Sequence, residues 1–452
     1  MSERFSDGFV WGCATASFQI EGAWNEDGKG LSVWDAFCRR AGAVYGGHTG
    51  DVACDHYHRY SEDVGIMRAL GLQAYRFSIS WPRVLPEGVG SPNERGLEFY
   101  DRLVDKLLES GIAPYATLFH WDFPYELFAR GGWLNRESAD WFAEYAALVA
   151  KRLGDRIRFW MTHNEPQCFI GLGHYQGVHA PGIRLGRAEV LRACHHQHLA
   201  HGKGVQAIRA NAAKPPQVGI APVGHAVIPA SESPADIEAA RQSTMSVQPD
   251  SFWNNTWWLD PLFFGRYPED GMAAYGSDMP EVRPGDMETI CQPLDFLGLN
   301  IYQAGTVRAG EGGKVESVPH PVGGPETVMG WPVTPAALRW GPRFLYERYK
   351  TPIYVTENGL ASMDWVAEDG SVPDGQRIDF LRRYIKELRN AIRDGVDCRG
   401  YFQWSLLDNF EWAEGYRKRF GLVYVDYTTL KRTVKDSGKW YATVVRENGA
   451  NL

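Results

Sequence analysis

The sequence predicts an α/β protein, a single (β/α)8 TIM barrel, and three observations lead to this fold. The 452 residues contain eight short apolar runs that end in polar residues, as the strands of a parallel barrel do. Amphipathic helical stretches lie between these runs, and regular alternation of strand and helix is typical of such barrels. No linker rich in Pro, Gly or Ser divides the chain, so we expect residues 1–452 to form one domain.

The eight predicted strands follow one another along the whole chain. Their approximate ranges, in order, are 9–15, 73–80, 113–120, 157–164, 218–225, 294–301, 352–357 and 400–405.

Helices are predicted between these strands from the spacing of apolar residues. Residues 98–108 place apolar side chains three to four positions apart, and Gly111 follows as a stop signal. Residues 138–153 and 376–394 show the same pattern. Long irregular segments follow the first, fourth and sixth strands, where we expect loops that deepen a pocket on the catalytic face. They span roughly 25–55, 165–190 and 303–340.

Composition excludes several classes of partner. The net charge is −8, which argues against nucleic acid or an anionic membrane as a partner. We expect no signal peptide, because the first residues lack its charged and apolar regions, and no apolar stretch of about 18 residues could span a membrane. Seven dispersed cysteines without a C-x-x-C pair indicate reduced thiols and a cytoplasmic location.

No cofactor or metal is expected. The sequence has no Gly-rich phosphate loop and no H-E-x-x-H pair. The histidines at 195–201 share helix faces, but they lie far from every strand end, and we predict no metal site there.

Two glutamates stand at the ends of predicted strands. Glu165 ends the run 160–165 and precedes Pro166, and Glu357 ends the run 353–357 shortly before Gly359. Each glutamate taken alone could cap the helix that follows its strand. Two carboxylates that face one another are what glycoside hydrolysis requires, one as a proton donor and one as a nucleophile or base.

Polar and aromatic side chains cluster at the other strand ends. Amides, an imidazole, carboxylates and indoles that converge on one mouth describe a carbohydrate site, because polar groups pair with hydroxyls and apolar walls stack on C–H faces. These residues are Gln19, Arg76, His120, Trp121, Asn164, Asn300, Tyr302, Trp404, Glu411 and Trp412.

Five motifs in this order resemble those of family 1 glycoside hydrolases, the family of β-glucosidases. Together they extend from residue 5 to about 427. The motifs are Phe9-Val10-Trp11-Gly12 through Gln19-Ile20-Glu21-Gly22, Tyr75-Arg76-Phe77-Ser78-Ile79-Ser80-Trp81, His163-Asn164-Glu165-Pro166, Thr356-Glu357-Asn358-Gly359, and Trp404-Ser405-Leu406-Leu407-Asp408-Asn409-Phe410-Glu411-Trp412.

The resemblance implies a role for each matching residue. Glu165 takes the place of the acid/base and Glu357 that of the nucleophile, in a double displacement with retention. Arg76 and Tyr302 fall beside the nucleophile, and Trp331 resembles the tryptophan on the aglycone side. The positions that bind the non-reducing sugar are Gln19, His120, Asn164, Trp404, Glu411 and Trp412.

Physical chemistry favours the same roles. Arg76 is a cation that can keep a nucleophilic Glu357 ionised. Burial and a second nearby anion would raise the pKa of Glu165, as a general acid requires. Cys168 is expected to line the pocket wall without taking part in the chemistry.

The expected substrates are β-glucosides or short β-linked oligosaccharides, hydrolysed at the terminal β-D-glucosyl residue. The resemblance leaves galactosides and fucosides open as further substrates. One alternative is a 6-phospho-β-glucosidase, which Glu411 disfavours by charge repulsion, although Arg417, Lys418 and Arg419 lie nearby. The other is a catalytically inactive sugar-binding protein. The sequence is compatible with a monomer and with a homo-oligomer.

Overall fold

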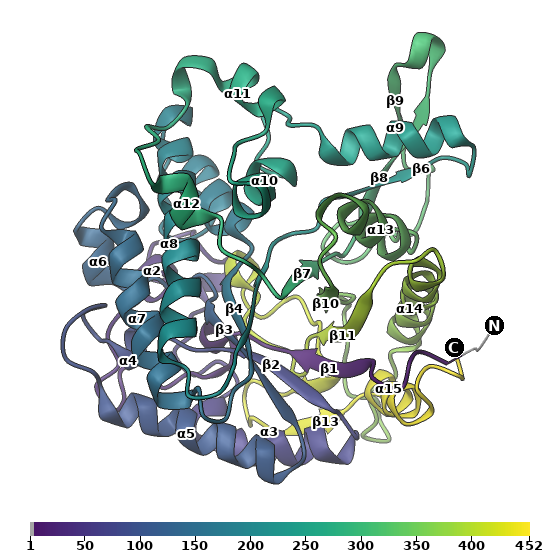
Figure 1. Ribbon diagram of the computed structural model, residues 1–452. Helices are drawn as coiled ribbons and strands as arrows, with labels where there is room; N and C mark the ends of the chain where they lie inside the picture. The colour runs from purple at the N-terminus through teal and green to yellow at the C-terminus, as the bar shows by residue number, and fades with distance from the viewer. Residues whose placement is uncertain (1–3) are drawn as a thin grey trace.

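A closed barrel of eight parallel strands forms the centre of the computed structural model, which describes residues 4–452 (Figure 1). The order of the strands around the barrel is β1-β11-β10-β7-β5-β4-β3-β2, so the first and last barrel strands pair and close it. This confirms the predicted fold class. The barrel strands are β1 Val10–Ala14, β2 Ala74–Ser78, β3 Ala113–Phe119, β4 Phe159–Asn164, β5 Gln217–Ala221, β7 Phe296–Asn300, β10 Ile353–Asn358 and β11 Cys398–Trp404.

Each barrel strand coincides with a predicted run, within a few residues at either end. The second strand ends before the predicted 80, because Trp81 and Pro82 begin the short helix α4 (Trp81–Val84). Proline is favoured in the first turn of a helix, where its missing N–H is not needed.

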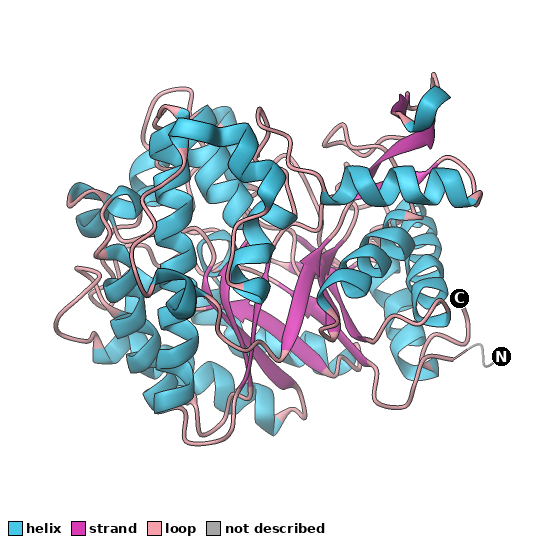
Figure 2. Cartoon of the chain, turned by 45° about the horizontal axis from the view of Figure 1, so that its top comes forward, coloured by secondary structure: helices cyan, strands magenta, loops and turns pink. Residues whose placement is uncertain are grey.

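Helices surround the strands, as the view in Figure 2 shows. Helix α5 (Glu94–Glu109) is longer than predicted, and it buries Leu97, Tyr100, Leu103, Val104 and Leu107 toward the barrel. Each such leucine stabilises the fold by about 1.5–3 kcal/mol. The other helices with eight or more residues are α3 His56–Ala69, α7 Ser138–Leu153, α8 Arg187–Asn211, α9 Pro234–Met245, α10 Thr256–Phe264, α13 Ala337–Tyr349, α14 Gly375–Arg393 and α15 Asp436–Glu447.

Parts of the three segments expected to be irregular are in fact ordered elements. Residues Gln167–Gln176 form a π-helical segment directly after β4. Strands β8 (Ala304–Ala309) and β9 (Val315–Val318) form a hairpin that projects from the barrel beside α9 (Figure 1). Sequence periodicity misses these elements because they are short. The remaining short α-helices and strands are α1 Ser17–Ile20, α2 Val33–Cys38, α6 Tyr125–Ala129, α11 Glu269–Tyr275, α12 Asp286–Ile290, β6 Ala226–Pro229, β12 Val423–Val425 and β13 Arg432–Val434.

Aromatic rings fill one end of the barrel interior. The rings of Tyr115 and Phe159 stack with centroids 4.2 Å apart, and Phe402 lies 4.9 Å from Tyr115. Gly12 on β1 leaves room for this layer, since a Cβ at that position would lie 2.7 Å from the ring of Phe402. The packed end leaves the opposite, carboxyl ends of the strands as the place for a pocket.

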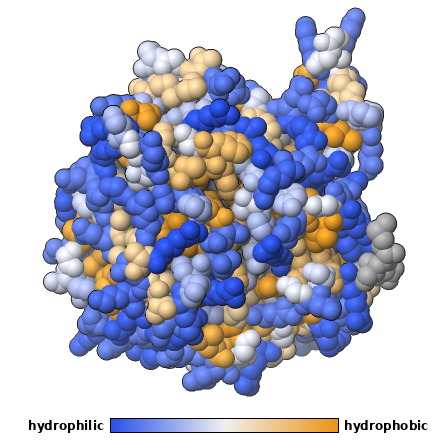
Figure 3. Space-filling model, viewed as in Figure 1, coloured by the Kyte–Doolittle hydropathy of each residue, from blue (hydrophilic) through white to orange (hydrophobic). Residues whose placement is uncertain are grey.

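Most of the surface in Figure 3 is hydrophilic, with hydrophobic residues scattered over it. Across residues 4–452, no helix has both the length and the apolar character needed to cross a bilayer.

Candidate active site

Glu165 lies at the carboxyl end of β4, in a backbone conformation that is unusual for its residue type. Its φ is 45°, and its N–H donates to the carbonyl of Ala221 at 2.8 Å. Trp121 and Trp412 at the same mouth also have positive φ, 80° and 50°. Non-glycine residues in this region cost of the order of 1–3 kcal/mol each and cluster at functional sites.

The carboxyl group of Glu165 receives few hydrogen bonds. Asn300 Nδ2 donates to Oε1 at 2.8 Å, and Cys168 Sγ donates to Oε2 at 3.2 Å. Burial and the nearby charge of Glu357 raise the pKa of Glu165 to about 8. Glu165 is therefore mostly protonated at neutral pH, which is the state of a general acid.

Glu357, near the end of β10, accepts hydrogen bonds from stronger donors than Glu165 does. Arg76 from β2 donates to its Oε1 at 2.5 Å, and the hydroxyl of Tyr302 donates to its Oε2 at 2.7 Å. Burial raises the pKa of Glu357, and these two residues oppose that rise. The negative charge is consequently held more readily on Glu357 than on Glu165.

A chain of buried hydrogen bonds joins the two glutamates. Arg76 donates to Asn164 Oδ1 at 2.6 Å, and Asn300 Nδ2 donates to the same oxygen at 2.9 Å. Because Arg76 also donates to Glu357 and Asn300 also donates to Glu165, these contacts run from one carboxyl group to the other.

A pocket of about 410 Å³ opens at this end of the barrel. This volume lies in the range of small-molecule sites. Gln19, Arg76 and Asn164 contact residues of the wall from behind it. The predicted site residues that line the pocket are His120, Trp121, Glu165, Asn300, Tyr302, Trp331, Glu357, Trp404, Glu411 and Trp412.

Polar groups without partners lie at one side of this pocket. Gln19 Nε2 donates to Glu411 Oε2 at 3.4 Å, and Asn164 Nδ2 bonds to His120 Nε2 at 3.1 Å. Among the residues described, Gln19 Oε1 and His120 Nδ1 are buried without a hydrogen-bond partner. Buried polar atoms are costly when unpaired, so these atoms suit the hydroxyls of a bound ligand.

Aromatic rings form the walls. Trp404 stacks on His120 at 5.8 Å, and Trp412 lies 4.4 Å from Trp121. On another side, Trp331 lies 5.3 Å from Tyr302. Flat apolar walls beside unpaired polar atoms fit the alternating faces of a sugar ring.

Several lining residues were missed from the sequence. Most of them lie on connections, and Val223, Gly224 and His225 lie just after β5, at the end of a run that was predicted to be strand. Aromatic residues and histidines in the long segments were the only available signal. The missed residues are Leu172, His179, Val223, Gly224, His225, Trp253, Gln303, Met329, Glu414 and Phe420.

The three basic residues near the pocket are committed to other partners. Arg417 pairs with Glu414 and lies 4.2 Å above the ring of Tyr45, and Lys418 donates to the carbonyl of Val328. Arg419 pairs with Asp408 at 2.7 Å. None of the three belongs to the lining of the pocket.

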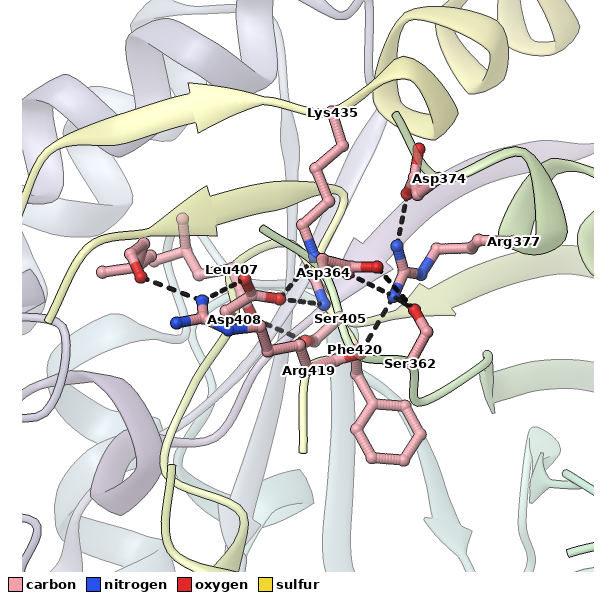
Figure 4. A network of polar contacts seen from close by, with 12 residues as sticks. Ser362, Asp364, Asp374, Arg377, Ser405, Leu407, Asp408, Arg419, Phe420 and Lys435 are labelled. Atoms are coloured by element: carbon pink, nitrogen blue, oxygen red, sulfur yellow. Dashed lines mark hydrogen bonds and ion pairs between the residues drawn. The ribbon is translucent and has the colours of Figure 1, made fainter. Parts of the chain in front are cut away.

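Arg419 is part of a buried network of charges behind the pocket (Figure 4). Lys435 bridges Asp364 at 2.5 Å and Asp408 at 2.6 Å. Arg377 pairs with Asp364 at 2.8 Å and also donates to the carbonyl of Arg419 at 2.9 Å. The network therefore ties the segment after β11, which carries Glu411 and Phe420, to the segment after β10. Its members are Asp364, Asp374, Arg377, Asp408, Arg419 and Lys435.

The buried histidines of α8 contact side chains and backbone of neighbouring elements. His195 bonds to Tyr267 and Asp286, both at 2.8 Å, and His201 bonds to Thr162 at 2.7 Å. Over residues 4–452, no group of three or more His, Cys, Asp or Glu side chains is placed to hold a metal ion.

Known proteins resemble this chain over its full length. It is 47% identical to β-glucosidase A of Thermotoga maritima over 99% of both chains, and 48% identical to a β-glucosidase of an Agrobacterium species over 98% and 96%. A bifunctional β-D-glucosidase/β-D-fucosidase of Bifidobacterium breve is 42% identical over all of both chains.

Solved structures of known proteins also resemble this chain. The β-glucosidase of Thermotoga maritima in complex with glucoimidazole superposes with a TM-score of 0.90 and covers 99% of both chains. The family model for glycosyl hydrolase family 1 matches residues 1–450. The chain therefore belongs to glycosyl hydrolase family 1.

Proposed function

We propose that the protein is a β-glucosidase that hydrolyses terminal, non-reducing β-D-glucosyl residues with retention. The observation that carries this proposal is that two buried carboxyl groups in one pocket have different hydrogen-bond donors. Glu357 accepts from Arg76 and Tyr302, whereas Glu165 accepts from an amide and a thiol. The first arrangement suits a nucleophile and the second a proton donor.

In the first half-reaction, a Glu357 oxygen attacks the anomeric carbon while the glycosidic bond breaks. Glu165 gives its proton to the glycosidic oxygen, and the aglycone leaves as an alcohol. Formation of the ester removes the negative charge of Glu357. Glu165 then loses its proton more readily, because that charge had helped to raise its pKa.

In the second half-reaction, the carboxylate of Glu165 takes a proton from water. The resulting oxygen nucleophile attacks the anomeric carbon, the ester bond breaks, and Glu357 leaves as a carboxylate. Two inversions give a β-product. Such a direct displacement requires the two carboxyl groups to lie about 5–5.5 Å apart.

The alternatives are less well supported. A 6-phosphate needs a free cation, and the three basic residues after Glu411 are all paired elsewhere. An inactive binding protein would not need stronger hydrogen-bond donors around one glutamate than around the other. Fucosides are a further substrate class, since a relative that matches this chain over the full length of both is a bifunctional β-D-glucosidase/β-D-fucosidase.

The test is hydrolysis of 4-nitrophenyl β-D-glucoside, followed by proton NMR in the first minutes. We expect β-glucose as the first-formed anomer. First formation of α-glucose would overturn retention, and absence of turnover would overturn the enzymatic assignment. If kcat/KM for the 6-phosphorylated glucoside exceeds that for the glucoside, the assignment of an unphosphorylated substrate is wrong.

All seven cysteines are free thiols, which supports our proposal of a reducing, cytoplasmic location. Cell fractionation with an antibody to the protein would test it.

A further inference from the structure

Cys168 lies directly against the carboxyl group of Glu165. It belongs to the first turn of the π-helical segment, and its N–H donates to the carbonyl of Glu165 at 2.9 Å. This local turn brings Sγ to 3.2 Å from Glu165 Oε2. The cysteine lines the pocket but is only 6% exposed.

The thiol keeps its proton in this position. Burial, followed by the charge of Glu165, raises the pKa of Cys168 well above that of an ordinary cysteine. The S–H group is therefore a donor, and Glu165 Oε2 is its acceptor. Asn300 donates to the other oxygen, Oε1, so each oxygen of Glu165 has one donor from the protein.

We propose that Cys168 is a positioning residue that acts through Glu165, by donating its S–H to Oε2 and favouring the ionised carboxylate. This inference rests on the proposed role of Glu165 as acid and base. The ionised form is needed in the second half-reaction, where Glu165 must accept a proton from water. On this proposal the thiol assists Glu165 in addition to lining the wall, the role expected from the sequence.

Other charged and titratable groups also face Glu165. Glu357 comes from β10, Arg76 from β2, Tyr302 from the segment after β7 and Glu411 from the segment after β11. His179 and His225 line the same pocket. A variant at Cys168 keeps all of these groups, so a change in the proton affinity of Glu165 that depends on the donor at position 168 can be assigned to the thiol.

The experiment compares Cys168→Val, which removes the donor but keeps the bulk, with Cys168→Ser, which keeps a donor. Two pH limbs report on Glu165. The alkaline limb of kcat/KM for 4-nitrophenyl β-D-glucoside reports the free enzyme. The acidic limb of kcat for a dinitrophenyl glucoside reports the glycosyl-enzyme, because its second half-reaction is slow.

We expect both limbs to move upward in Cys168→Val, by about half a pH unit, since S–H is a weak donor. In Cys168→Ser they should lie at or below the wild-type positions. Cys168→Ala serves as a second donor-free variant in case the branched side chain disturbs packing. Cys291→Ala removes a thiol outside the pocket lining and should leave both limbs unchanged.

Unchanged limbs in the Val and Ala variants, or equal shifts in the Val and Ser variants, would overturn the role of Cys168. Failure of the proposed function would look different. In that case the wild type would not hydrolyse the glucoside, or Glu165→Gln would keep the alkaline limb.

Discussion

At the scale of single residues, the donors around each carboxyl group distinguish the two glutamates. Arg76 and Tyr302 each donate to one oxygen of Glu357, whereas no cation among residues 4–452 lies within hydrogen-bond distance of Glu165. The difference places the charge on one group and the proton on the other, and it makes the two residues separable by experiment.

Glu357→Ala should lower turnover roughly 10⁴-fold or more, because no other group can attack the anomeric carbon. Added azide should restore turnover and give α-glucosyl azide, since the anion enters from the face that the carboxylate vacated. NMR of the product is the measurement, and Glu357→Gln, which fills the space, is the control. A β-azide product would place the nucleophile elsewhere.

Glu165→Ala should discriminate between leaving groups. Alkyl glucosides and cellobiose need a proton on the departing oxygen, so their kcat/KM should fall by about 10²–10⁴-fold. Dinitrophenyl glucoside leaves without protonation and should show a burst of phenol before slow turnover. Stopped-flow absorbance gives the burst. Equal losses for both kinds of substrate would contradict the acid/base role.

At the scale of elements, the charge network of Figure 4 holds the pocket segments together. Three cations and three carboxylates connect the segments after β10 and β11 with the start of α15. Each member is at least mostly buried, and buried charges are tolerated only when they are paired.

Lys435→Met should remove about 3–5 kcal/mol of unfolding free energy, because Asp364 and Asp408 would lose their shared cation. Below the new melting temperature, kcat/KM should fall as well, since Asp408 anchors the segment of Glu411. Urea denaturation and glucoside kinetics measure both effects.

The matched control is Lys439→Met in α15, the helix that begins directly after Lys435. Its ammonium group is exposed and pairs with an exposed carboxylate, that of Asp436, so the free energy of unfolding should change by no more than about 0.5 kcal/mol. Equal effects of the two variants would show that the network does not stabilise the fold.

At the scale of the whole molecule, both ends of the chain complete the barrel. β1 pairs with β11, and Trp11 donates from its indole to Asn448 near the carboxyl terminus at 2.9 Å. The backbone N–H of Phe5 donates to the carbonyl of Asn448 at 3.1 Å, so the first described residues lie against the carboxyl-terminal segment. A destabilising substitution in β1 should therefore lower the stability of the whole barrel.

Trp11→Ala should lower the free energy of unfolding by about 3–5 kcal/mol, because a fully buried indole is lost. If residues 1–452 form one domain, helical circular dichroism and activity should be lost in a single, coincident transition at a lower temperature. Trp365→Ala, at a position that is 68% exposed, is the control. Two separate transitions would contradict a single domain.

The sequence by itself determined the positions of the eight barrel strands and the placement of Glu165 and Glu357 at the ends of two of them. Apolar runs that end at polar clusters are local patterns, and the carboxyl ends of parallel strands in a closed barrel must meet. The prediction was weaker in the long connections. The helical segment 167–176 and the hairpin of β8 and β9 lack a long periodic pattern, so they were expected as irregular loops.

Only the tertiary structure decided which side chains touch. The bond between Arg76 and Glu357 spans 281 positions, and Asn300 reaches Glu165 across 135. The sequence placed Arg417, Lys418 and Arg419 near the pocket but could not show that each is paired elsewhere. Hydrogen-bond direction and burial depend on neighbours that are brought together only when the barrel closes, and these neighbours set the pKa of each carboxyl group.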